Sequence, residues 1–258
     1  MKKYPAFFFG HWSPLNAILD TPFSREWEKI GKTLEKPTAI ISISAHFERQ
    51  GAYITAMNSP KTIYDFSWFP EELYQVHYPM KWSQKIANEI IEHLGKDEIF
   101  PDYSWWIDHG TWTILKFLFP SIWDIPVLQI SLDIKKTPQE HFYFAQKLHY
   151  LREKWYLIMW SGNIVHNLYQ IDWYNESNIF QWAQEVNNEV KSMLLSWDIE
   201  KLFDFRKLWA KYDIAIPTYE HFIPIFYIYA LKWEDEKIEF FNEWIVHGSL
   251  SMDSFKIF

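Results

Sequence analysis

Three of the ten histidines follow segments that look like β-strands, and this shared position points to a common site. His11 follows an apolar run ending at Gly10, His46 follows a run ending at Ala45, and His166 comes shortly after an apolar run near residue 160. The carboxyl ends of parallel strands line the ligand crevice of open α/β sheets. Neutral imidazole is a common ligand for zinc and iron, and the chain has no cysteine. The pattern favours a metal site over three separate hydrogen-bonded loop histidines.

Three further histidines lie at loops or expected helix starts, where each could face a substrate crevice. His109 follows Asp108, His77 lies in a loop before a helix, and His221 follows Glu220. A carboxylate beside a histidine can orient it or raise its pKa. Of the remaining histidines, His247 is expected to be structural. The other three are expected to be solvent-exposed on polar helix faces: His93, His141 and His149.

Composition excludes several classes of protein. The 258 residues carry a net charge of −8 with no basic run, which argues against nucleic-acid binding. The absence of cysteine excludes disulfides, iron–sulfur ligation and a cysteine nucleophile. No apolar run reaches the roughly 18 residues of a membrane span, and the start lacks the pattern of a signal peptide. A Gly-x-Ser-x-Gly nucleophile turn is also absent. We therefore expect a cytoplasmic protein without membrane or nucleic-acid partners; the sequence does not indicate its oligomeric state.

Apolar runs alternate with longer amphipathic segments, as strands alternate with helices in α/β proteins. Strands are expected at 6–10, 38–45, 126–131, 156–160 and 249–257, and helices at 24–34, 83–94, 111–119, 138–153, 179–195 and 221–231. The continuous apolar run at 39–43 is typical of a strand buried on both faces. We predict a single α/β domain over residues 1–258, with a central, mostly buried β-sheet flanked by helices on both faces.

Seven short motifs resemble those of one enzyme family and occur in the family's order. They are Gly10-His11-Trp12-Ser13-Pro14, Ser44-Ala45-His46, His77-Tyr78-Pro79, Asp108-His109-Gly110, the segment from Ser161 to Leu168, Pro217-Thr218-Tyr219-Glu220-His221 and Gly248-Ser249-Leu250-Ser251-Met252. The family is that of the 4,5-DOPA extradiol dioxygenase-like (LigB-like) proteins, which belong to the class III extradiol ring-cleaving dioxygenases. The resemblance spans residues 6–252.

The resemblance implies a metal held by His11, His46 and His221, with His166 either a further ligand or the acid/base of turnover. Because other class III enzymes use two histidines and a glutamate, Glu220 is the alternative to His221. His109 is implied as a catalytic and substrate-binding residue, and His77 as a substrate-binding one. Asp108, which precedes His109, could orient its ring.

The implied reaction is ring cleavage of a catecholic, DOPA-like substrate by O2, giving a semialdehyde. Fe(II) is expected in turnover, and Zn²⁺ in the isolated protein. Two alternatives stay open: a zinc-dependent hydrolase that uses the same histidines to activate water, and a non-catalytic metal-binding member of the fold.

The numbers of glycines and tryptophans are unusual. Among its 258 residues the chain has only 7 glycines, far fewer than the usual share of about 7%, and it has 16 tryptophans. Eleven tryptophans fall where the family has glycine or where a turn would favour it: Trp12, Trp68, Trp82, Trp106, Trp123, Trp155, Trp160, Trp197, Trp209, Trp233 and Trp244. Some bacterial lineages read UGA as glycine, so we expect that UGA codons were translated here as tryptophan. The alternative is a protein that is naturally rich in tryptophan. Trp12 is expected to cause steric trouble beside His11.

Overall fold

Strand β1 (Ala6–Gly10) shows why the sheet is buried on both faces. All five of its residues are buried, and alternate side chains enter different cores. Phe7 and Phe9 pack in the core that contains residues of helices α1 (Pro22–Thr33) and α4 (His109–Leu118). Ala6 and Phe8 belong to the core on the opposite side of the sheet. An apolar strand of this kind is stable only between two layers of helices.

The computed structural model describes residues 2–57, 61–121, 124–208 and 210–258. Its other strands are β2 (Ala39–Arg49), β3 (Tyr53–Thr55), β4 (Phe100–Asp102), β5 (Val127–Asp133), β6 (Tyr156–Gly162), β7 (Ile238–Phe241), β8 (Ile245–Val246), β9 (Leu250–Ser251) and β10 (Ser254–Ile257). Its other helices are η1 (Pro14–Ala17), α2 (Glu71–Tyr74), α3 (Gln84–Leu94), α5 (Pro138–Gln146), α6 (His149–Glu153), η2 (Leu168–Gln170), α7 (Gln181–Ser196), α8 (Ile199–Phe203), α9 (Phe205–Leu208), α10 (Ala210–Ala215) and α11 (Pro224–Ala230).

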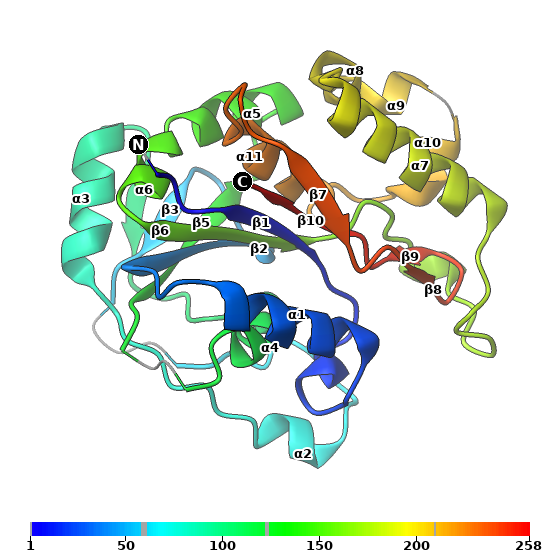
Figure 1. Ribbon diagram of the computed structural model, residues 1–258, viewed down its shortest axis with the longest axis horizontal. Helices are drawn as coiled ribbons and strands as arrows, with labels where there is room; N and C mark the ends of the chain where they lie inside the picture. The colour runs from blue at the N-terminus through cyan, green and yellow to red at the C-terminus, as the bar shows by residue number, and fades with distance from the viewer. Residues whose placement is uncertain (1, 58–60, 122–123, 209) are drawn as a thin grey trace.

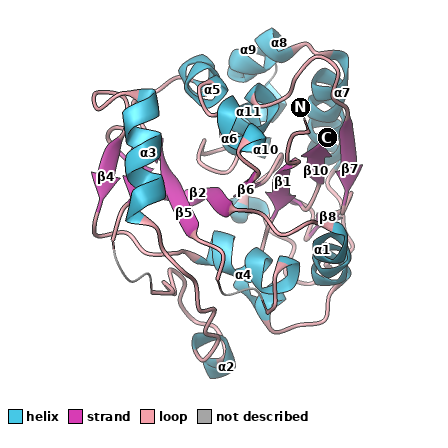
Figure 2. Ribbon diagram, turned by 60° about the vertical axis from the view of Figure 1, so that its left-hand side comes forward, coloured by secondary structure: helices cyan, strands magenta, loops and turns pink. Residues whose placement is uncertain are grey.

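Eight of the strands form one mixed sheet in the order β4-β3-β5-β2-β6-β1-β10-β7. The central strands β5, β2, β6 and β1 are parallel, and β10 and β7 add an antiparallel edge. Helices α1 and α4 cover one face, and α5, α6 and α11 lie on the other (Figure 1). Figure 2 shows the sheet passing between these two helical layers. The predicted fold class is therefore confirmed.

The elements depart from the expectations in a few places. The expected helix at 138–153 is two helices, α5 and α6, and the expected strand at 249–257 is divided into β9 and β10. The short strands β3, β4 and β7 were not expected. His141 and His149 are not solvent-exposed: His141 is buried beside Tyr227, and His149 bonds the carbonyl of Ala230. His93, by contrast, is exposed as expected, with its ring stacked on Tyr150.

Several tryptophans have backbone conformations that are uncommon for residues with a side chain. Trp68, Trp155 and Trp197 have φ of 69°, 65° and 63°. Trp12 is not among the described residues with positive φ, and its ring lies near Trp173 and His247. Two of the eleven positions, 123 and 209, lie outside the described residues.

No helix in the described part of the chain is long and apolar enough to cross a membrane.

Candidate metal centre and active site

Two parallel strands, β1 and β2, which lie on either side of β6, bring two of the histidines together. β6 lies between β1 and β2, and Gly10 at the end of β1 pairs with Gly162 at the end of β6. His11 follows β1 directly. His46 lies within β2, not after it, in a segment where the pairing with β5 shifts register between Ile43 and Glu48. A bulge of this kind re-aims side chains near a site.

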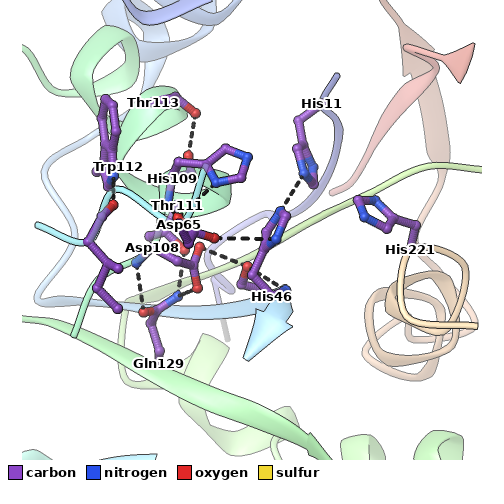
Figure 3. Close-up of polar contacts among 12 residues, drawn as sticks. His11, His46, Asp65, Asp108, His109, Thr111, Trp112, Thr113, Gln129 and His221 are labelled. Atoms are coloured by element: carbon purple, nitrogen blue, oxygen red, sulfur yellow. Dashed lines mark hydrogen bonds and ion pairs between the residues drawn. The ribbon is translucent and has the colours of Figure 1, made fainter. Parts of the chain in front are cut away.

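The histidine rings converge across the carboxyl ends of these strands. Nε2 of His11 lies 3.1 Å from Nε2 of His46. The ring centroid of His221 is 5.2 Å from that of His11 and 5.5 Å from that of His46. The ring of His109 lies 4.2 Å from His46 and 5.9 Å from His11. Figure 3 shows His11, His46, His109 and His221 surrounding one small region. Four imidazoles from distant parts of the chain therefore share one site.

Asn163 fixes the position of His221. Its side-chain oxygen lies 2.9 Å from Nδ1 of His221, and its amide nitrogen donates to the carbonyls of His11 (2.6 Å) and Ser251 (2.7 Å). An amide oxygen can only accept, so Nδ1 of His221 donates and Nε2 carries the free lone pair. Asn163 is completely buried. One side chain thus ties the His11 loop to the His221 turn and sets the tautomer of the ring.

Helix α4 brings His109 to the site because a glycine follows it. A Cβ on Gly110 would lie 2.7 Å from Oγ of Ser161 and 3.0 Å from Cδ2 of His46. Only glycine allows the first turn of the helix to approach β2 this closely. His109 is buried, and the edge of its ring meets Phe66 at a centroid distance of 5.5 Å.

The carboxylate that orients His109 is Asp65, and the expectation for Asp108 was wrong. Oδ1 of Asp65 lies 2.9 Å from Nδ1 of His109 and also accepts from the His109 backbone N–H. Asp108 instead accepts hydrogen bonds from Ser44 and Gln129, both at 2.8 Å. The Asp108 side chain is fully buried against these two partners.

Burial strongly favours the neutral form of the imidazoles of His11, His46 and His221. It lowers the pKa of His11 and His221 well below the usual range, and neighbouring histidines lower them further. Burial and the charge of His109 lower the pKa of His46 to about 3. Burial raises the pKa of Asp65, but the hydrogen bond from His109 and the nearby histidines lower it to about 2. The site therefore combines the neutral imidazoles of His11, His46 and His221 with the carboxylate anion of Asp65.

His166 and Glu220 lie on the far side of His221. The ring of His166 stacks on that of His221 at 3.6 Å and 10°, and burial lowers its pKa to about 4. Possible ligand atoms fall into two groups, each within 4.8 Å: His11, His46 and His109 in one, and His166, Glu220 and His221 in the other. Glu220 also accepts a hydrogen bond from Thr218.

His77 stands apart from the other histidines. It is exposed in the loop after α2, and within the described residues it shares none of the ring contacts that join the other five.

His11 and His46 are spaced to bind one divalent transition metal together. Two nitrogen ligands that each lie about 2.1 Å from one ion are themselves about 3 Å apart. The 3.1 Å between Nε2 of His11 and Nε2 of His46 matches that separation. Neutral imidazoles gathered in this way suit zinc or iron.

Comparison with known proteins identifies the family of this chain. Residues 12–251 match the family described as the catalytic LigB subunit of aromatic ring-opening dioxygenase. The chain belongs to this family. It is 37% identical to the 4,5-DOPA dioxygenase extradiol of Escherichia coli K12, over 99% of this chain and 95% of that protein. It is 30% identical to the protein of the same name from Beta vulgaris, over 97% of this chain and 95% of that one.

A solved structure supports the same conclusion. The fold matches the crystal structure of an uncharacterized protein from Escherichia coli K12 with a TM-score of 0.86 and 34% identity, covering 98% of this chain and 99% of that one. The LigB family consists of ring-cleaving dioxygenases, so the chain is an enzyme of the extradiol ring-cleaving type.

Two residues of the site in this LigB-family chain were not predicted from the sequence. Asp65 lies in an aromatic run with no periodicity or motif to mark it, and it contacts a histidine 44 positions away. Asn163 lies inside a recognised motif, but nothing local indicates that it bonds a ring 58 positions away. A fully buried asparagine between two site loops is a signal that only the structure provides.

Proposed function

We propose that the protein is a non-haem Fe(II)-dependent extradiol dioxygenase that opens a catecholic, DOPA-like ring with O2. The product would be a semialdehyde that carries both oxygen atoms. The observation that supports this proposal most strongly is that the ring centroids of His11, His46 and His221 all lie within 5.5 Å of one another. The relatives named 4,5-DOPA dioxygenase extradiol suggest the substrate class.

His11, His46 and His221 would hold the ion, and these three residues suit either Fe(II) or Zn²⁺. Bound Fe(II) would supply Lewis acidity toward the catechol hydroxyls and open positions for the catechol and O2. His221 is preferred to Glu220 because its ring faces His11 and His46, whereas the Glu220 carboxylate accepts from Thr218.

His109 and His166 are proposed as the residues that handle protons. Since Nδ1 of His109 donates to Asp65, its Nε2 is free to accept a hydrogen bond from a catechol hydroxyl. His166 is neutral when buried, so it can accept a proton and return it when the ring opens. Phe66, which meets the edge of His109, provides an apolar contact for an aromatic ring. His77, which is exposed in the loop after α2, is proposed as a substrate-binding residue from its motif alone.

A cavity beside the site has charges suited to an amino-acid side chain on the substrate. Its volume is about 510 Å³, and its lining includes Glu48, Glu220, Lys135 and Arg206. Carboxylates and basic groups in one cavity could receive the ammonium and carboxylate of a zwitterion. Glu220 lines this cavity, and its carboxylate also lies within 4.8 Å of possible ligand atoms of His166 and His221, so the cavity adjoins these two histidines. This lining supports an amino-acid catechol over a plain one.

The proposal is tested with metal-depleted protein reloaded with Fe(II), L-DOPA and O2. We expect oxygen uptake together with a yellow ring-opened product. His221→Ala should lose iron binding, whereas His109→Ala should keep it and lose turnover by about 10²–10⁴-fold. Absence of oxygen uptake with any catechol would reject the function. Iron binding by His221→Ala equal to that of the parent chain would reject the ligand assignment.

A further inference from the structure

Asp65 lies between two of the site imidazoles and faces both. Its Oδ1 is 2.9 Å from Nδ1 of His109, and its Oδ2 is 3.4 Å from Nδ1 of His46 (Figure 3). Oδ2 is buried and makes no hydrogen bond within the described residues, and its contact with Nδ1 of His46 is an ion-pair contact at 3.4 Å. Nδ1 is therefore the nitrogen of His46 that faces the carboxylate.

These two contacts determine which nitrogen of each ring is free. A neutral imidazole has one N–H and one lone pair. When Nδ1 faces a carboxylate it carries the proton, and Nε2 keeps the lone pair. Nε2 of His46 then points toward Nε2 of His11, 3.1 Å away, where a metal ligand is needed. Nε2 of His109 is left free in the same site.

The backbone around Asp65 is attached to the segment that begins α4. The N–H of Ile63 donates to the carbonyl of Ile107 at 2.8 Å, and the indole of Trp112 donates to the carbonyl of Ile63 at 3.0 Å. The N–H of His109 completes this attachment at Oδ1 of Asp65. The carboxylate and His109 are therefore held as one unit against β2.

We propose that Asp65 is a positioning residue that orients both the metal ligand His46 and the pocket base His109. A single carboxylate then joins metal binding to proton handling, because losing it frees both rings to change tautomer. The proposal rests on the proposed function for the role of His109. Its role at His46 depends only on metal binding.

The experiment measures Zn²⁺ affinity by competition with a chromophoric chelator, and kcat and KM with Fe(II) at saturation. Asp65→Asn should weaken Zn²⁺ binding by about 10–100-fold. At saturating iron it should still lower kcat, with little change in KM, and Asp65→Glu should restore part of both. Asp108→Asn is the matched control, because this neighbouring buried carboxylate bonds Ser44 and Gln129 and neither ring. The control should keep the Zn²⁺ affinity.

Unchanged Zn²⁺ affinity in Asp65→Asn, or full recovery of kcat at saturating iron, would overturn the proposal. An equal loss of Zn²⁺ affinity in Asp108→Asn would also overturn it, because it would show a general effect of damage to the fold. If the parent chain opens no catechol, the proposed function fails, and the Zn²⁺ measurement alone still decides the role of Asp65 at His46.

A second inference comes from the helix ends. Trp197 ends α7 in the left-handed conformation, with φ of 63°. Trp155 follows the last residues of α6 with φ of 65°, and Trp68 has φ of 69° in a loop. Glycine is the usual residue at such positions, since a side chain there meets the backbone. Of the five non-glycine residues with positive φ in the described chain, three are tryptophan.

We infer that the protein made in its source organism has glycine at these three positions. All three belong to the eleven positions singled out by composition. None of the five remaining tryptophans has positive φ, namely Trp27, Trp105, Trp112, Trp173 and Trp182. Restoring glycine at all eleven would give 18 glycines and 5 tryptophans, which is ordinary usage.

Codons and peptide masses test this inference directly. We expect UGA at the codons for residues 68, 155 and 197 and UGG at those for 27 and 112. Peptides from the protein isolated from its source should have the mass of glycine at the first three positions and of tryptophan at the other two. UGG codons at 68, 155 and 197, or tryptophan masses there, would overturn the inference.

Discussion

Trp68→Gly should stabilise the protein, although it removes a large side chain. Trp68 is fully exposed, so its indole contributes no burial, while its φ of 69° is unfavourable for any residue with a Cβ. The left-handed conformation costs such a residue about 1–2 kcal/mol. Glycine also makes the unfolded chain more flexible, and this offsets about 0.4–1 kcal/mol of the gain in stability. The net gain is about 0.5–1 kcal/mol, or about 1–4 °C in Tm for a domain of this size.

The assay is thermal and urea unfolding of the parent chain beside two control variants. Trp173→Gly also removes an exposed indole, but Trp173 does not have positive φ, so the change should lower Tm. Trp112→Gly removes a fully buried ring from α4 and should cost at least about 3–5 kcal/mol. The reasoning is refuted if Trp68→Gly lowers Tm as much as Trp173→Gly does.

Three further changes test other parts of the structure. Asn163→Ala should weaken Zn²⁺ binding by about 10–100-fold in a chelator competition, because His221 loses the partner of its Nδ1; unchanged affinity would contradict this. Arg152→Ala should cost about 3–5 kcal/mol in urea unfolding, because it leaves the buried carboxylate of Glu236 unpaired; a loss under 1 kcal/mol would exclude that explanation. Burial lowers the pKa of His141 to about 4, so the unfolded state binds more protons between pH 4 and 6.5, and stability should fall as pH drops through that range, by up to about 3 kcal/mol. Unfolding curves of His141→Phe should show a weaker dependence on pH, and an unchanged dependence would assign it to other groups.

The four central strands β1, β2, β5 and β6 were predicted from the sequence, whereas their order in the sheet was not. The runs before His11 and His46 are apolar enough to be strands buried on both faces, and such strands are parallel and central. Their carboxyl ends lie at the same edge of the sheet, so histidines there must approach one another. The short strands β3, β4 and β7 were missed because they have only three or four residues and little periodicity.

The sequence by itself determined which imidazoles are available, the fold class and the family, because these depend on residue types, order and hydrophobic pattern. Only the tertiary structure decided which nitrogen of each imidazole faces the site. Asp65 orients His109 and Asn163 orients His221 across 44 and 58 residues of chain, and such contacts leave no local pattern. Asp108 adjoins His109 in sequence, yet its side chain turns toward Ser44, because the direction of a side chain is set by packing and not by adjacency.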